Sequence, residues 1–196
     1  SEVAPAKHVE LDETPFRKVA LRKNPPGLIA VARQFDTALT ALHVDNRPLV
    51  LIVEQVEKPG NLGAMMRTAD AVGVDAVVVA DATTDVFNPN VVRASQGSLF
   101  TVPLGVANTG DAIAWTQELS LRVVGGYPSA PVELWQTPMT GPLAILVGAE
   151  DVGISPAWKD IAAPVQIPMA GAADSLNASV AAAILLFEAA RQRRAG

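Results

Sequence analysis

The 196-residue chain contains no cysteine and only two histidines. The absence of cysteine excludes disulfides, thiolate-bound metals and a cysteine nucleophile. Both histidines, His8 and His43, fall in the weakly patterned N-terminal region, so a histidine-based triad or a zinc site is not expected. We interpret each histidine as a surface residue, and catalytic chemistry has to come from other side chains.

Long apolar runs are missing, and charged residues are scarce. The longest apolar run, 180–187, is far shorter than the roughly 18 residues of a membrane span. The N-terminus has no basic-then-apolar signal pattern. With 49% hydrophobic and 18% charged residues, the chain is expected to form one compact domain, with room for a short appendage. We expect a soluble cytoplasmic protein that does not contact a membrane.

Excess positive charge is also absent. A net charge of −5 argues against a surface that binds nucleic acid throughout, because phosphate contacts need clustered lysine and arginine. Two local basic clusters lie near the start and at the end of the chain: Arg17, Lys18, Arg22 and Lys23, and Arg191, Arg193 and Arg194. We interpret both clusters as solvated surface charge, the second also favouring the C-terminus of the last helix.

Two common nucleotide-binding signatures are missing. No segment has the spacing of a P-loop, and the loop at 58–63 lacks the glycine spacing of a dinucleotide-binding turn. A P-loop kinase or GTPase is therefore excluded, and a dinucleotide site has no direct support.

Strand-like and helix-like segments alternate from residue 48 onwards, which predicts an α/β fold with a parallel sheet. A short strand at 28–33 and a connection with a helical turn at 34–47 precede them. The expected strands are 49–56, 74–81, 101–106, 121–127, 143–148 and 164–169. The expected helices are 62–73, a short one within 91–100, 111–120, another short one near 157–161, and the one that closes the chain. Functional sites in such folds lie at the carboxyl ends of the strands.

Three loops at strand ends mix glycine with a few polar residues. In the first, Asn61 is expected to cap the following helix, and Arg67 lies within that largely apolar helix, where it is expected to meet a partner or an anion. In the second, Glu150 follows a strand directly and is placed either to cap the next turn or to pair with an arginine such as Arg67. The third loop brings Ser175 and Asn177 to the start of the last helix.

These three loops resemble the motifs of one family, the SpoU (TrmH-like) branch of the SPOUT superfamily of RNA 2′-O-ribose methyltransferases. The matching stretches are NLGAMMRTAD (61–70), LVGAEDVGIS (146–155), and the run from Ile167 to Arg193 with its Ser-Leu-Asn. RASQGSLFTVP (93–103) also resembles the family, and the likeness covers roughly 48–194. It departs from the family at Ala178, where valine is usual, and at Ala149-Glu150-Asp151, where Asn-Glu-Gly or Ser-Glu-Gly is commoner.

The resemblance implies a deep trefoil knot in the C-terminal part of the domain and a homodimer whose active site uses both protomers. It further implies S-adenosylmethionine as methyl donor and RNA as substrate. No metal is expected, because the leaving group already carries a positive charge. The family's catalytic positions fall on Arg67, Asn61, Glu150, Ser175 and Asn177. Its cofactor-binding positions fall on Gly125, Gly126, Val147, Gly148, Ile167, Met169 and Leu176.

In this interpretation Arg67 orients the ribose hydroxyl and the adjacent phosphate, with Asn61 and Glu150 orienting Arg67 in turn. An arginine is unsuited to act as a base because its pKa is too high.

The resemblance also divides the chain. Residues 1–47 are expected to be an extension and linker, a remnant of an RNA-substrate-binding domain, because NPPGLIAVAR (24–33) resembles the linker after such a domain. Residues 48–196 are expected to be the methyltransferase domain. The linker favours ribosomal RNA as the substrate. Alternatives are a transfer RNA 2′-O-methyltransferase, a non-catalytic RNA-binding or assembly protein with the same knot and, more distantly, a nicotinamide oxidoreductase.

Overall fold

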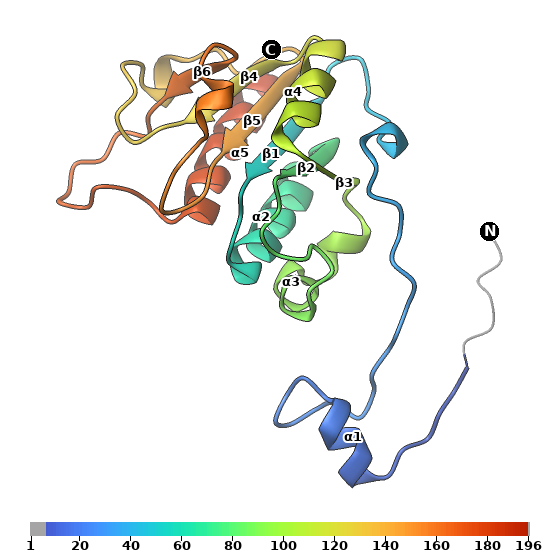
Figure 1. Ribbon diagram of the computed structural model, residues 1–196. Helices are drawn as coiled ribbons and strands as arrows, with labels where there is room; N and C mark the ends of the chain where they lie inside the picture. Colours follow the sequence, from blue (N-terminus) through green and yellow to red (C-terminus); the bar gives the residue numbers. More distant parts are fainter. Residues whose placement is uncertain (1–6, 196) are drawn as a thin grey trace. The chain divides into compact units, whose positions relative to one another are not determined.

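The computed structural model describes residues 7–195, which divide into two units at Phe35 and Asp36 (Figure 1). The described part of the first unit holds one short helix, α1 (Glu13–Val19), in which Arg17 donates a hydrogen bond to Glu13. Residues 28–33 do not form the expected strand. That prediction is wrong because the segment has no neighbouring strand to pair with, and Val31 is 97% exposed.

The second unit is built on a six-stranded sheet in the order β3-β2-β1-β5-β4-β6. Every pair of neighbouring strands is parallel, which confirms the predicted α/β class with a parallel sheet. The strands are β1 (Leu49–Glu54), β2 (Ala76–Ala80), β3 (Leu104–Ala107), β4 (Arg122–Gly126), β5 (Leu143–Val147) and β6 (Ala162–Val165).

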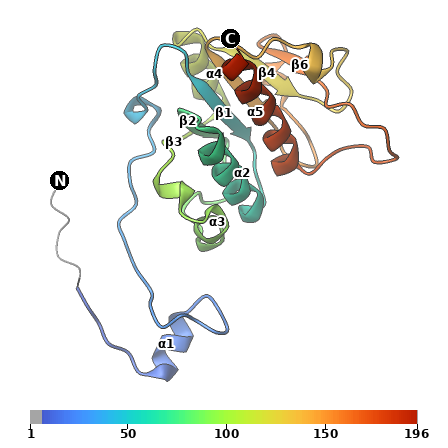
Figure 2. The ribbon, with the colours of Figure 1, turned by 180° about the vertical axis from the view of Figure 1, so that it is seen from behind.

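Helices cover both faces of this sheet. The α-helices are α2 (Pro59–Val72), α3 (Pro89–Ser95), α4 (Thr109–Glu118) and α5 (Ala178–Ala195). Short 3₁₀ turns are η1 (Leu39–Ala41), η2 (Ser98–Phe100), η3 (Leu134–Gln136) and η4 (Pro156–Trp158). The views from front and back show α2 and α5 on one face of the sheet and α4 on the other (Figures 1 and 2). No helix within residues 7–195 is long and apolar enough to cross a membrane.

The central strand β1 explains why the core has two halves. All six of its residues are buried, as expected for a strand covered on both faces. Leu51 and Val53 join the apolar cluster that includes residues of α2 and α5, whereas Val50 and Ile52 join the cluster that includes α4 and Trp158. The alternation follows from the two-residue repeat of a strand.

The helix α2 begins earlier than the sequence suggested. It starts at Pro59, which suits the first helical position because proline lacks the N–H that would be unpaired there. Lys58 therefore holds the cap position, and Asn61 lies inside the first turn, so the prediction of Asn61 as the cap is wrong. The predicted stop at Gly73 is confirmed, since its φ of 77° is in the left-handed region that glycine favours.

Near the other end of the chain, β6 was expected at 164–169 but ends at Val165. It pairs only with β4, on the edge of the sheet. Ile167 and Met169, expected within this strand, therefore lie beyond it in the loop that leads to α5.

The last turns of α5 are fastened to the loop before β5. The Gln192 amide donates to Thr137 O at 3.0 Å and accepts from Met139 N at 2.7 Å. Arg193 donates to Gly141 O at 2.6 Å and also to Arg47 O. The basic cluster was expected to be solvated surface charge that also favours the end of the last helix, and the solvated part of this expectation is wrong for Arg193, which binds carbonyl oxygens.

Candidate active site

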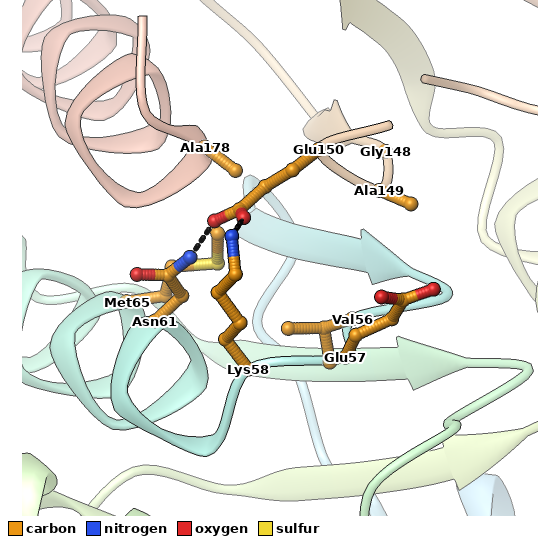
Figure 3. A pocket seen from close by; sticks show the side chains of 9 residues that line it. All are labelled: Val56, Glu57, Lys58, Asn61, Met65, Gly148, Ala149, Glu150 and Ala178. Carbon is orange, nitrogen blue, oxygen red and sulfur yellow. Dashed lines mark hydrogen bonds and ion pairs between the residues drawn. The ribbon is translucent and has the colours of Figure 1, made fainter. Parts of the chain in front are cut away.

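The site lies where the order of the sheet reverses. From β1 the chain moves outward through β2 to β3 and then returns to the opposite side of β1 with β4 and β5. In open parallel sheets, ligands bind beyond the carboxyl ends of the two strands at such a point. Here these are β1 and β5, and a pocket opens beyond them (Figure 3). The pocket is lined by Val56, Glu57, Lys58, Asn61, Met65, Gly148, Ala149, Glu150 and Ala178.

Glu150 is the centre of a polar cluster in this pocket. Its carboxylate accepts hydrogen bonds from the Lys58 ammonium and from the Asn61 amide, and both side chains point at it in Figure 3. The Asn177 amide lies 3.3 Å from Asn61 Oδ1 and 3.4 Å from Glu150 Oε1. Asn61, Glu150 and Asn177, which the sequence places in three separate segments, therefore meet in one site.

Two of these side chains are positioned by the N-terminal ends of helices. Asn61 lies in the first turn of α2, and Asn177 directly precedes α5. The Asn177 side-chain oxygen accepts hydrogen bonds from Ser179 N at 2.9 Å and Ser179 Oγ at 2.6 Å. Asn177 therefore caps α5 with its oxygen, and its amide nitrogen remains free to turn toward Glu150.

Lys58 was not among the residues predicted from the sequence. It forms an ion pair with Glu150, whose side chain is only 22% exposed, while the Lys58 side chain is 66% exposed. Its position between the end of β1 and the first turn of α2 was visible in the sequence. However, the lysine side chain is long and flexible, so the sequence did not show which carboxylate it would pair with.

Arg67 and Ser175 lie outside this cluster. Both are exposed, and neither side chain makes a hydrogen bond or ion pair with another residue of the described part of the chain. Within the chain, Glu150 pairs with Lys58 and Asn61 rather than with Arg67. Arg67 projects from α2 as an unpaired cation that is available to an anion or to another molecule.

The seven expected cofactor-binding residues lie at the carboxyl ends of the neighbouring strands β5, β4 and β6 or in the loop that follows β6. Gly125 and Gly126 end β4, Val147 ends β5, and Gly148 follows it. A side chain at Gly148 would collide with the loop above it, because a Cβ there would lie 2.2 Å from Gly153 C. Position 148 therefore requires glycine, and the backbone comes within close reach of its surroundings.

The loop between β6 and α5 suits a ligand held by backbone groups. From Ile167 to Leu176, all within the described residues, no backbone group makes a hydrogen bond to another backbone group. Ile167, Met169 and Leu176 thus belong to a segment whose N–H and C=O groups remain available. Together with the glycines at the ends of β4 and β5, this segment fits a flat ligand with polar edges.

A buried acid lies beneath the site. Glu54 ends β1 and is fully buried, and the phenol of Tyr127 lies close enough to sense its charge. Partial burial, and secondly the negative charge of Glu54, raise the pKa of Tyr127 above its ordinary value of 10.0. Tyr127 therefore stays protonated at neutral pH, able to donate a hydrogen bond at the end of β4.

Comparison with known proteins points to one family. The pattern of the SpoU rRNA Methylase family matches residues 48–187. The chain is 35% identical over 179 residues to the 23S rRNA (uridine(2479)-2′-O)-methyltransferase of Streptomyces viridochromogenes, covering 88% of this chain. It spans only 62% of that protein's length.

Two further relatives cover more of the chain. The 23S rRNA (guanosine-2′-O-)-methyltransferase RlmB of Ralstonia nicotianae is 33% identical over 98% of this chain and 80% of its own length. An AdoMet-bound rRNA methyltransferase from Sinorhizobium meliloti has a similar structure, with a TM-score of 0.87 and 34% identity. That match covers 92% of this chain and 70% of the other.

Proposed function

The chain belongs to the SpoU rRNA methylase family, and from this premise we propose that it transfers a methyl group from S-adenosylmethionine to a ribose 2′-hydroxyl of ribosomal RNA. The observation that carries the proposal is the hydrogen-bonded cluster of Asn61, Glu150 and Asn177. It joins one residue from each family motif at the point of the sheet where ligands are expected. The relatives named as acting on 23S rRNA favour ribosomal over transfer RNA.

The proposed methyl-donor site lies at the ends of β4, β5 and β6. When bound, S-adenosylmethionine supplies an electrophilic methyl group. The residues that would hold it are Gly125, Gly126, Val147, Gly148, Ile167, Met169 and Leu176. Support comes from the close backbone approach at Gly148 and from the unpaired backbone between Ile167 and Leu176. Backbone groups of this kind recognise the edges of a nucleoside without bringing charge into the site.

The chain's own side chains have to position a weak nucleophile. A ribose hydroxyl is poorly ionised at neutral pH, so the reaction depends on holding its oxygen in line and assisting loss of the proton. We assign Arg67 to bind the phosphate next to the target ribose and to orient the hydroxyl. Its guanidinium cannot accept a proton, so the RNA phosphate is the proposed proton acceptor.

The Glu150 cluster then has a supporting part in catalysis. Asn61, Asn177 and Lys58 all direct donors at Glu150 or at each other, which keeps their side chains in fixed positions. We assign Asn61, Asn177 and Ser175 to the wall of the reacting pocket, with Glu150 holding the two asparagines. Such preorganisation lowers the barrier because no reorientation is needed as the methyl group moves.

We also propose the knot and the homodimer that the family implies. Within the sheet, β4 separates β5 from β6, and the chain after β6 must still reach α5, which packs against α2. This route supports a C-terminal trefoil knot in a methyltransferase domain of residues 48–196. The unpaired, exposed Arg67 supports a dimer in which it completes the site of the partner protomer. The proposed location is the cytoplasm, where ribosomal RNA would be available.

The test replaces Arg67 by alanine in the full chain. Transfer of labelled methyl groups from S-adenosylmethionine is measured on 23S rRNA and on bulk transfer RNA, and cofactor binding is measured by calorimetry. We expect R67A to lose at least about a hundredfold in methyl transfer while cofactor affinity changes by less than about twofold. The control R194A removes an exposed arginine from the end of α5 and is expected to keep its activity.

Three outcomes would contradict the proposal in different ways. Retained activity in R67A would remove Arg67 from the mechanism. Methylation of transfer RNA without methylation of 23S rRNA would overturn the substrate class. Cofactor binding without methylation of either RNA would favour a non-catalytic RNA-binding protein.

A further inference from the structure

Glu54 is a fully buried acid whose side-chain hydrogen bonds are made to α4, to the loop 148–155 and to η4. Its Oε1 accepts from Ser155 Oγ at 2.7 Å, Thr109 Oγ1 at 2.8 Å and Trp158 Nε1 at 3.0 Å. Its Oε2 accepts from the backbone N–H of Ser155 at 2.7 Å. One carboxylate thus connects the end of β1 to the start of α4, to the end of the loop 148–155 and to η4.

The pattern of donors requires a carboxylate. The indole N–H of Trp158 faces Oε1, and the backbone N–H of Ser155 faces Oε2. Neither of these groups can accept a hydrogen bond, unlike the two hydroxyls that also contact Oε1. A glutamine amide would therefore direct its NH₂ group at an N–H in either orientation, and a buried donor would be left without a partner.

The loop that Glu54 holds also carries Glu150. The loop leaves β5 at Gly148, folds back through a bridge between Ala149 and Gly153, and reaches η4 through Ser155. Gly153 has a φ of 71°, which marks the turn. The loop's first end is fixed by the sheet and its second end by Glu54, so the position of Glu150 between them depends on both attachments.

The same strand supplies the opposite side of the site. Glu54 is the last residue of β1, and the chain then runs through a few residues to Lys58 and Asn61, which bind Glu150. Holding the loop 148–155 against the end of β1 therefore sets the separation between Glu150 and its two donors. A loop released at Ser155 would move Glu150 relative to Asn61.

We propose that Glu54 is a positioning residue for methyl transfer, acting through Glu150 by fixing the loop 148–155 to the end of β1. The inference rests on the proposed function. Glu54 does not touch the substrate or the cofactor. Its contribution is the rigid placement of the groups that do, and small misplacements at a reacting centre carry large losses in rate.

The test compares E54Q with a matched control, E188Q. Both variants change a buried glutamate to glutamine, but Glu188 lies ten residues along α5 from Ala178, the helix residue that lines the pocket. We expect E54Q to lower kcat by at least about tenfold, with KM for the RNA changing by less than about threefold. E188Q is expected to lower the melting temperature and to keep kcat within about twofold of the wild type.

A double-mutant cycle separates positioning from general weakening of the fold. If Glu54 acts through Glu150, E54Q adds little to the loss of kcat in an E150A background. If Glu54 only stabilises the domain, the two losses multiply. Amide hydrogen exchange gives an independent reading, because E54Q is expected to speed exchange at 148–155 and E188Q is not.

A rescue and a milder variant complete the test. In E54Q/W158F the indole N–H is absent, so the glutamine NH₂ group can occupy the position of Oε1, where only the hydroxyls of Ser155 and Thr109 remain. We expect kcat to recover partly relative to E54Q. S155A removes only one hydroxyl, and it replaces E54Q as the test if E54Q does not fold. The expected loss of kcat in S155A is smaller.

Two results would overturn this inference alone, provided that the wild type is active. One is an E54Q variant with the kcat of the wild type, and the other is a double-mutant cycle in which the two losses of kcat multiply. A wild type that methylates no RNA would overturn the proposed function and this inference with it.

Discussion

At the scale of residues, three glutamate side chains that accept several hydrogen bonds each organise the site and stabilise the domain. Glu150 accepts hydrogen bonds from Lys58, Asn61 and Asn177, and Glu54 accepts four hydrogen bonds beneath the pocket. Glu188 has a comparable part in α5, where it is bound by Arg191 and Gln192. A buried carboxylate is costly unless donors surround it, so the two buried acids, Glu54 and Glu188, constrain the segments that supply their donors.

Glu188 makes the stability of the domain depend on pH. Its side chain is 5% exposed, and hydrogen bonding from Arg191 lowers its pKa below the ordinary value of 4.5. A lowered pKa means that the carboxylate stabilises the fold at pH above that ordinary value, and that this contribution is lost as the pH falls through the lowered pKa. Because the Arg191 side chain is 66% exposed, water weakens its ion pair with Glu188. We therefore expect E188Q to lower the free energy of unfolding by only about 1 kcal/mol at neutral pH.

The measurement is thermal unfolding of the wild type and E188Q across a pH series. The gap between their melting temperatures should stay constant above pH 4.5 and narrow as the pH falls further. A gap that persists in strong acid would show that glutamine disturbs the packing rather than the charge.

At the scale of elements, the close crossing of α2 and α3 fixes the helix that carries Asn61 and Arg67. A Cβ on Gly63 would lie 2.5 Å from Ala94 Cβ and 2.8 Å from Val91 O, so the helices meet where α2 has no side chain. Asp70, two turns further along α2, accepts hydrogen bonds from Ser98 and Thr101. The same segment, 91–101, therefore holds α2 at two levels, and Arg67 projects to solvent between them.

We expect G63A to separate α2 from α3 and to destabilise the domain by about 1–3 kcal/mol, as overpacking of a close contact does. Denaturant unfolding measures the loss. G60A is the matched control, because a Cβ on Gly60 in the same helix meets nothing within 4 Å. Equal effects of the two substitutions would show that the crossing does not depend on Gly63.

At the scale of the whole molecule, α5 presents an apolar face that the rest of the described chain leaves uncovered. Val180 and Phe187 are 46% and 55% exposed and lie seven residues apart, which places them on one side of the helix. The half-buried Ile184 lies between them. Exposed apolar residues in such a row are typical of an interface, and the proposed homodimer would bury them.

Sedimentation analysis tests this arrangement. We expect the wild type to sediment at about twice the 20.4 kDa of one chain, because burying the α5 face removes apolar side chains from water. F187E should shift the population to monomers and, with Arg67 unable to reach a partner's site, should also reduce methyl transfer. Arg17 on the short helix α1 provides the control R17E, which is expected to leave the mass unchanged. A wild-type monomer with full activity would contradict the two-protomer site.

Much of the fold follows from patterns within short segments. Runs of buried residues predicted the strands around β1, β2 and β5 closely, and Gly73 predicted the end of α2. These features depend on burial and on backbone preferences, which are largely set by the residue type and its nearest neighbours in the chain. The prediction of a strand at 28–33 was wrong because a strand also needs a partner strand, which the pattern of a short segment does not show.

The sequence by itself determined the alternation of strands and helices from residue 48 onwards and the parallel sheet that this alternation forms. Only the tertiary structure decided where β6 ends and which side chains meet: Lys58 rather than Arg67 at Glu150, and Trp158 and Ser155 at Glu54. The physical reason is that periodicity records whether a position is buried, whereas a hydrogen bond depends on the placement of two atoms from distant segments. That placement arises only when the strands have packed and the loops at their ends have closed.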